Sequence, residues 1–443
     1  MDATSLGQLV PLREWETAFL PGLHLTPAEV RLADYLRAGT DVRLHVDSLR
    51  EGTRVTADSW VGVVHFEQFH VRVIPKLAGG ALGLVDMIEF AAGLDSLRRL
   101  PADRLLSTES AGLFDLIALL FLEACDAVIR SGLFRDYRER EEELGVMRGR
   151  LLIDQQVIHR FGRLDRLICR FDEQEYDVLE NRIIAAALGP CARYATHESV
   201  RRRAHLMNAL FRQLCDPEAL DPATAHQDLQ YNRLNEHYRE AHTLAFLILR
   251  GLGIEDMLAQ GTTRSFAFLI DMNALFERFV LRLIEYALPA TEYSVRYQRS
   301  DRSILWNADT NRPYARVVPD ILVIPRPSRQ IQLAIDAKYK LYDETKVASS
   351  DLYQAFLYAY AFSAGRAAGL PRAFLIYPSS GVSADWLRLQ VRDSARMPAA
   401  EILALGISIP DALKEIRLSQ RGPVTNALAE GISRAIGGSR DKL

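Results

Sequence analysis

Three side chains in the last third of the sequence have the types and spacing needed for metal-dependent hydrolysis of a phosphodiester. Asp320 follows a proline at the start of one apolar run, and Asp336 and Lys338 lie at the end of the next. In an extended strand, side chains two positions apart lie on the same face, about 6.6 Å apart. If the two runs form neighbouring strands, two carboxylates and one ammonium group converge on one place.

This trio suits hydrolysis assisted by Mg²⁺, or by Mn²⁺ in its place. Carboxylates bind Mg²⁺ through one or two oxygens and leave other coordination positions for water and phosphate. The ion polarises a phosphoryl oxygen and acidifies a bound water, which a nearby lysine orients. The carbonyl of Ala337 is a candidate further ligand. The alternative is a solvated Asp–Lys pair, but the apolar flanks of both runs favour the nuclease interpretation.

The surrounding pattern predicts an α/β domain over residues 263–443. A helix is expected at 272–288, with Asp271 as its N-cap and Pro289 as its stop. The other expected elements follow it in the order strand, strand, strand, helix, strand, near 291–299, 315–324, 330–339, 350–364 and 373–378.

Two further parts precede this domain. Residues 1–80 alternate apolar and polar side chains and predict a β-rich domain, interrupted by one helix near 26–38 that Thr26 caps. Residues 81–262 change to a helical period and predict a helical connector, in which 144–161 forms a strand leading into a helix. The fold class is therefore a three-part α/β protein.

Bulk composition limits how the chain meets its partners. A protein that bound DNA by overall charge would be strongly basic, whereas this chain of 443 residues has a formal net charge of −3. A local basic surface or a partner must then supply the affinity. The densest basic run, Arg201 to Arg203, is better explained as a solvated helix face than as a DNA-binding patch.

Other sequence features point to a cytoplasmic protein. The four cysteines form no Cys-x-x-Cys pair, so buried free thiols are expected rather than a zinc site or a disulfide framework. The first residues lack the pattern of a signal peptide, and no apolar run reaches the roughly 18 residues of a membrane span.

The motifs also resemble a known family. Pro319-Asp320 followed by Asp336-Ala337-Lys338 resembles the PD-(D/E)xK nuclease signature. The segments PDILV and AIDAKYK, with DMNALFERFV before them and DLYQAFLYAYAF and LIYPSSG after them, resemble the McrC family more closely. McrC proteins are the nuclease subunits of McrBC-type, modification-dependent restriction systems. The similarity is strongest over 265–381 and covers most of the chain more weakly, and the gap between Asp320 and Asp336 is slightly longer than in many relatives.

The resemblance implies a restriction-endonuclease-like domain with supporting residues. Glu277 would complete the metal shell, although a surface glutamate paired with Arg278 or Arg282 is an equal alternative. Gln354 and Tyr358 would border the site and contact DNA, the alternative being a polar helix face. Lys340 is expected to reach a phosphate, and Tyr339 to lie in the core.

The resemblance also implies partners. An AAA+ GTPase hexamer similar to McrB would bind the N-terminal region, be stimulated by it, and recognise 5-methylcytosine-type modifications in double-stranded DNA. The chain lacks a GxxxxGK[ST] loop, so it is not the motor itself. Dimerisation is expected during cleavage, because a double-strand cut needs two sites. Two other interpretations stay open: a nuclease of another defence or repair system, alone or with a different motor, and a non-catalytic assembly subunit.

Overall fold

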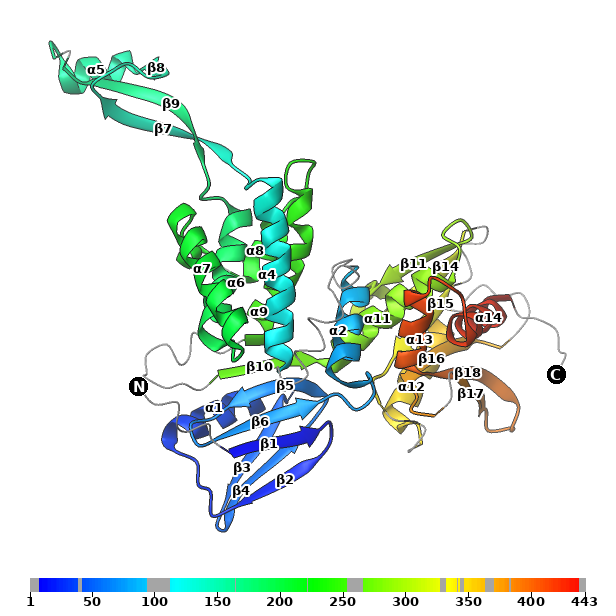
Figure 1. The fold of residues 1–443 in the computed structure, drawn as a ribbon. Helices are drawn as coiled ribbons and strands as arrows, with labels where there is room; N and C mark the ends of the chain where they lie inside the picture. Colours follow the sequence, from blue (N-terminus) through cyan, green and yellow to red (C-terminus); the bar gives the residue numbers. More distant parts are fainter. Residues whose placement is uncertain are drawn as a thin grey trace. The chain divides into compact units, whose positions relative to one another are not determined.

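The computed structural model forms two compact units (Figure 1). Unit 1 comprises residues 1–97 and 258–443, and unit 2 comprises 98–257. The residues described are 8–38, 42–93, 112–163, 165–220, 222–252, 266–326, 332–340, 342, 346–362, 370–381 and 384–437. The three parts expected from the sequence therefore form two units rather than three. The first and third belong to one unit, and residues 81–97 join that unit rather than the connector.

The N-terminal part of unit 1 contains two sheets. Strands β1, β6 and β5 belong to a four-stranded sheet, and β2, β4 and β3 form a three-stranded one. Helix α1 packs beside β3, with the predicted cap present: the Thr26 hydroxyl accepts from the Glu29 N–H, and the Glu29 carboxylate accepts from the Thr26 N–H. The bounds are β1 Gln8–Arg13, β2 Thr17–Pro21, α1 Pro27–Arg37, β3 Leu44–Leu49, β4 Gly52–Ala57, β5 Trp60–His65 and β6 Phe69–Ile74.

The chain returns to this first sheet about two hundred residues later. Strand β10 (Phe266–Asp271) pairs antiparallel with β5, so that Leu269 lies opposite Gly62. Helix α2 (Gly80–Ala92) packs against α11 (Met272–Ala287), which follows β10 directly. The backbone on both sides of unit 2 is thus joined within a single sheet.

The C-terminal part of unit 1 is a six-stranded sheet in the order β11-β14-β15-β16-β18-β17. Strands β15, β16 and β18 run parallel, and the other pairs are antiparallel. Helix α12 covers one face, and Gly431 of α14 lies against Phe374 on the other. The bounds are β11 Tyr293–Tyr297, β14 Ile321–Pro325, β15 Leu333–Ala337, α12 Ser349–Phe362, β16 Arg372–Pro378, β17 Ala384–Arg392, β18 Pro398–Ile407, α13 Ile409–Arg417 and α14 Pro423–Gly437.

Several expected elements of this part are confirmed and one is corrected. The helix capped by Asp271 is present, and the Asp271 carboxylate accepts from the Asn273 N–H at 2.9 Å. The single strand expected at 315–324 is wrong, because the chain forms two strands there. Strand β13 (Arg312–Val317) pairs with β12 (Asp301–Asn307) in a separate hairpin, and β14 begins after a break that contains Asp320.

Unit 2 consists of a helical bundle and a projecting arm (Figure 1). The helices are α4 Leu113–Ser131, α6 Leu179–Tyr194, α7 Glu198–Leu214, α8 Pro222–Asp228 and α9 Arg239–Leu252. In the arm, β9 (Leu167–Glu175) lies between β7 (Asp136–Leu144) and β8 (Arg150–Leu151), and α5 (Ile153–Arg160) follows β8. The strand leading into a helix is confirmed. The region predicted as a helical connector also contains the antiparallel pair of β7 and β9, which the sequence pattern did not indicate.

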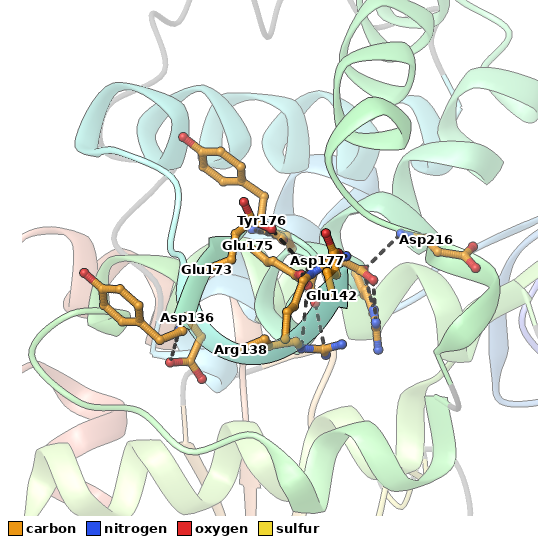
Figure 2. A network of polar contacts seen from close by, with 12 residues as sticks. Asp136, Arg138, Glu142, Glu173, Glu175, Tyr176, Asp177 and Asp216 are labelled. Atoms are coloured by element: carbon orange, nitrogen blue, oxygen red, sulfur yellow. Dashed lines mark hydrogen bonds and ion pairs between the residues drawn. The ribbon is translucent and has the colours of Figure 1, made fainter. Parts of the chain in front are cut away.

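Polar contacts join the base of the arm to the helices, as Figure 2 shows around Asp177. The Arg182 guanidinium on α6 donates two hydrogen bonds of 2.7 Å to the Asp177 carboxylate. The same carboxylate accepts from the Asp216 N–H at 3.1 Å, and Arg138 on β7 donates to the Asp177 carbonyl. A forked guanidinium–carboxylate pair restricts orientation as well as distance, so the loop after β9 is held to the bundle.

The remaining expectations on composition agree with the structure. All four cysteines are buried and free. The basic run lies on α7 and is neutralised, because Arg201 and Arg202 pair with Glu198, and Arg203 pairs with Glu123 and Asp126. Within the described ranges, no helix is long and apolar enough to cross a membrane.

The close approach of β5 and β10 yields a stability prediction. A Cβ atom on Gly62 would lie 2.0 Å from the Phe268 carbonyl oxygen, so Gly62→Ala must push the two strands apart. We expect a loss of about 3 kcal/mol in the free energy of unfolding, measured by urea denaturation. The control is Gly381→Ala, where a Cβ would meet nothing within 4 Å. Equal stability of the two variants would contradict the prediction.

Candidate active site

The pairing of β14 with β15 brings the two predicted acids together. Ile321 lies opposite Ile335, which places Asp320, one residue before β14, beside Asp336 in β15. The Asp320 carboxylate accepts a hydrogen bond of 2.9 Å from the Ala337 N–H. Asp320 is therefore tied to the backbone of β15, next to Asp336.

Lys338 completes the predicted trio. Its ammonium group lies 3.0 Å from an Asp336 carboxylate oxygen, and its N–H donates to the Ile376 carbonyl, which continues the pairing of β15 with β16. Burial lowers the pKa of the Lys338 amine, but the charges of Asp336 and Asp320 outweigh it and raise that pKa. The lysine therefore stays a cation beside the acids.

The two carboxyl groups are in an environment that disfavours their charge. Asp336 is only 1% exposed, and burial raises its pKa to about 7; the negative charge of Asp320 adds to this, while Lys338 opposes it. Burial and the charge of Glu277 likewise raise the pKa of Asp320. One lysine does not offset this cluster of acids.

Glu277 on α11 points toward this cluster rather than along its helix. Its carboxylate accepts from the Gln298 amide at 3.1 Å and from the Tyr297 hydroxyl at 3.4 Å. The Gln298 N–H in turn donates to the Asp320 carbonyl at 2.8 Å. Of the suggested surface partners, Arg282 pairs instead with Glu285. The structure thus favours the orientation in which Glu277 borders the site.

The donor set fits a small divalent cation. One buried oxygen of Asp336, Oδ2, has no hydrogen-bond partner among the described residues. An unmet buried acceptor is costly, and a cation would satisfy it. No three acidic, histidine or cysteine side chains in the described ranges form a ready-made cluster for a metal. Mg²⁺ needs fewer, since one or two carboxylates hold it with several waters. Asp320, Asp336 and the Ala337 carbonyl meet that requirement.

Gln354 and Tyr358 on α12 support the segment before Asp320. The Gln354 amide donates to the Tyr358 hydroxyl at 2.8 Å, and that hydroxyl donates to the Val318 carbonyl at 2.9 Å. Tyr358 is buried in the core between α12 and the sheet. Its position is suited to holding the Val318–Asp320 loop, and Gln354 is the half-buried member of the pair.

Lys340 is placed apart from the trio. Its ammonium group pairs with Asp351 at the start of α12 at 2.8 Å, and the Tyr342 hydroxyl donates to the same carboxylate. The expected contact of Lys340 with a phosphate would compete with this ion pair. The role of Lys340 in contacting DNA stays a prediction.

Sequence reasoning missed several neighbours of the site. Tyr339 is buried, as expected of a core residue, but its hydroxyl donates to Glu14 at 3.0 Å. Glu14 also accepts from the Lys76 N–H, and burial raises its pKa to about 7. Contacts across 325 residues leave no local signal. Gln298 offered none either, although its positive φ of 42° marks a strained turn beside Asp320.

The buried carboxyl of Asp336 predicts a dependence of stability on pH and on Mg²⁺. Its pKa rises from 3.8 to about 7, so its favourable contribution is full below pH 3.8 and is lost as the pH rises through 7. In EDTA at pH 8, Asp336→Asn should therefore have a free energy of unfolding greater than that of the wild type by on the order of a few kcal/mol, and it should unfold at a higher temperature. The difference should shrink toward pH 4.

Adding Mg²⁺ at pH 8 should raise the unfolding temperature of the wild type and leave that of Asp336→Asn nearly unchanged. Asp385→Asn, at an exposed position on β17, serves as the matched control and should respond like the wild type. An equal response of all three proteins to Mg²⁺ would contradict a cation site at Asp336.

Comparisons with known proteins place the chain in a family. The family model described as "McrBC 5-methylcytosine restriction system component" matches residues 55–378. No curated protein matches the chain. A solved assembly of Thermococcus gammatolerans McrB AAA+ hexamers with bound McrC is similar, with 19% identity and a TM-score of 0.61 over 97% of this chain and 100% of that one.

A cryo-EM structure of the Thermococcus gammatolerans McrBC complex also matches, with 20% identity and a TM-score of 0.48 over 64% of this chain and 88% of that one. At these identities the first likeness concerns the fold, and it agrees with the mixed α/β, multidomain class predicted from sequence. Since the family model spans most of the sequence, the chain belongs to the McrBC family of 5-methylcytosine restriction-system components.

Proposed function

We propose that this chain is the Mg²⁺-dependent DNA endonuclease subunit of a 5-methylcytosine-type, modification-dependent restriction system. The observation that carries the proposal is the meeting of Asp320, Asp336 and Lys338, with one buried oxygen of Asp336 left without a partner. The arrangement of two acids and a lysine on adjoining strands supports a PD-(D/E)xK nuclease domain over residues 263–443.

Each residue has a separate task in this proposal. Asp320 and Asp336 hold the cation with the Ala337 carbonyl, and Glu277 is the candidate for a further ligand through the first hydration layer. When bound, the ion would polarise a phosphoryl oxygen of the substrate and lower the pKa of a bound water. Lys338, kept positive by its acidic neighbours, orients the attacking water and offsets charge developing on the phosphate. Tyr358 holds the loop that carries Asp320.

A non-catalytic scaffold explains these residues poorly. A buried and a half-buried carboxyl with raised pKa values weaken the folded state wherever they are ionised, so they would not help a purely structural domain. Clusters of acids with such shifts are more often found in functional sites. A nuclease of another defence or repair system would use the same chemistry, and the motor partner distinguishes it.

Cleavage of DNA tests the proposal. We expect Asp336→Asn and Lys338→Gln to cut plasmid containing 5-methylcytosine at least about 100-fold more slowly than the wild type, with GTPase partner, GTP and Mg²⁺ present. Both variants should still stimulate GTP hydrolysis by the partner, which shows that they fold and assemble. The control Asp385→Asn should cleave normally. Equal nicking by wild type and Asp336→Asn would contradict the assignment.

We also propose a ring-forming AAA+ GTPase as the partner. The similar solved assembly contains McrB AAA+ hexamers with bound McrC. The resemblance suggested the N-terminal region as the contact, where Arg54 on β4 is exposed and Arg72 on β6 is half-buried. The arm of unit 2 is a stronger candidate, because large apolar side chains are exposed around β8 and α5; these are Val146, Met147, Ile153, Ile158 and Phe161. Such a cluster in water favours burial against another protein.

Substitution at the end of the arm tests this contact. Ile158 and Phe161 are 74% and 85% exposed, so Ile158→Asp with Phe161→Asp should leave the fold intact. We expect the pair to reduce binding to the GTPase and its stimulation at least tenfold, because anchoring apolar residues carry most of an interface's energy. Leu206→Asp, at an exposed position on α7, is the matched control. Unchanged stimulation by the double variant would rule out the arm.

A further inference from the structure

A cavity lined by arginines lies at the β11 edge of the six-stranded sheet. Its volume is about 440 Å³, and its walls come from β11, the end of β14 and the start of β15. Three of the seven lining residues are arginines and none is acidic; the lining is Ser294, Arg296, Arg299, Ile324, Pro325, Arg326 and Gln332. Its chemistry is that of an anion site.

The cavity shares a face of the sheet with the acidic pair. Arg296 pairs with Leu322, and Leu322 pairs with Ala334, so these three side chains point to the side covered by α12. Asp336 lies two residues beyond Ala334 and therefore points the same way. Arg296 is two strands across the sheet from Asp336, about 10 Å, and one row along it, about 7 Å. Because the two offsets are perpendicular, the strand positions of Arg296 and Asp336 are about 12 Å apart.

The guanidinium groups here are available to a ligand. The described ranges hold no ion-pair partner for Arg296 or Arg326, and the Arg326 side chain is oriented by its hydrogen bond of 2.7 Å to the Ala290 carbonyl. Arg299 lies near Asp301, whose pKa is lowered mainly by hydrogen bonds from Ser303 and also by the positive charge of Arg299. By contrast, the sequence's densest basic run, Arg201 to Arg203, is neutralised by acids on α4 and α7.

The surrounding segment is basic in an acidic protein. Residues 293–326 contain six arginines and three aspartates, whereas the whole chain has a formal net charge of −3. A chain of this overall charge that binds DNA needs a local basic surface, because phosphate contacts supply most of the sequence-independent affinity.

We propose that this cavity binds backbone phosphates of the DNA strand, within a few nucleotides of the phosphate that is cut. This range follows from the distance of about 12 Å between the strand positions of Arg296 and Asp336. Arg296 and Arg326 carry the contact, and the polar ends of Ser294 and Gln332 add hydrogen bonds. The proposal rests on the proposed nuclease function, because it assigns a track for that site's substrate.

The test measures binding rather than cleavage, so that it stands apart from the nuclease activity. The full-length chain is titrated in EDTA into a short fluorescent duplex, unmodified or carrying 5-methylcytosine, at several salt concentrations. For Arg296→Gln with Arg326→Gln, the slope of log affinity against log salt should fall by about 2, roughly one unit for each lost phosphate contact. The loss should be equal for both duplexes. Arg296→Gln alone, at an exposed position, should lower the slope by about 1.

The matched control is Arg201→Gln with Arg202→Gln, which removes the same charge from a paired surface and should leave the slope unchanged. An equal fall in slope for control and test variants would overturn the proposal, as would a wild type that binds no duplex. A second titration adds GTP to the complex of the chain with the fluorescent duplex and measures how much duplex is released. It shows whether the cavity binds the phosphates of a free nucleotide instead of those of DNA. If GTP displaces the duplex from the wild type but not from Arg296→Gln with Arg326→Gln, the cavity binds free nucleotide phosphates and the DNA proposal is overturned. If Arg296→Gln with Arg326→Gln keeps the wild-type slope while Asp336→Asn fails to cleave, the nuclease assignment holds and only the phosphate site is disproved.

Discussion

Two carboxyl groups side by side, one buried and one half-buried, are the constraint on which the C-terminal part of unit 1 depends. Asp320 and Asp336 each make ionisation of the other harder, and one ammonium group, that of Lys338, lies against them. In a medium of low dielectric constant, such a cluster is stable only if protons or a cation supply the missing charge. The electrostatic repulsion that weakens the metal-free fold is thus the physical basis for the cation site proposed here.

The elements around the acids maintain that arrangement from three directions. The β14–β15 register ties Asp320 to the Ala337 N–H, and Tyr358 on α12 holds the loop from behind. From the N-terminal sheets, Glu14 binds the hydroxyl of Tyr339, whose ring lies 5.7 Å from that of Phe276 on α11. Because Tyr339 follows Lys338 directly, the N-terminal part of the unit contributes to the position of the lysine.

The sequence predicted those parts of the site that depend on strand alternation and helix caps. Asp336 and Lys338 share a face because of the period of a strand, and the Asp271 cap set the start of α11. The direction of Glu277 was undetermined, since it depends on how α11 is rotated toward β11. The antiparallel pair of β7 and β9 was missed for another reason. β7 is the charged sequence DYREREEEL, exposed along nearly all its length, so it shows no apolar period.

The pairing of β5 with β10 has a consequence for biosynthesis. The N-terminal sheet acquires its last strand only after the ribosome has made all of unit 2, because β5 pairs with β10, which follows unit 2 in the sequence. Until then β5 presents an open edge of unpaired backbone groups, a surface prone to association with other chains. The inserted unit, in contrast, is continuous in sequence and can fold as it emerges. Truncation before β10 would thus leave a fragment with an unpaired strand edge that is prone to aggregate, rather than a stable smaller domain.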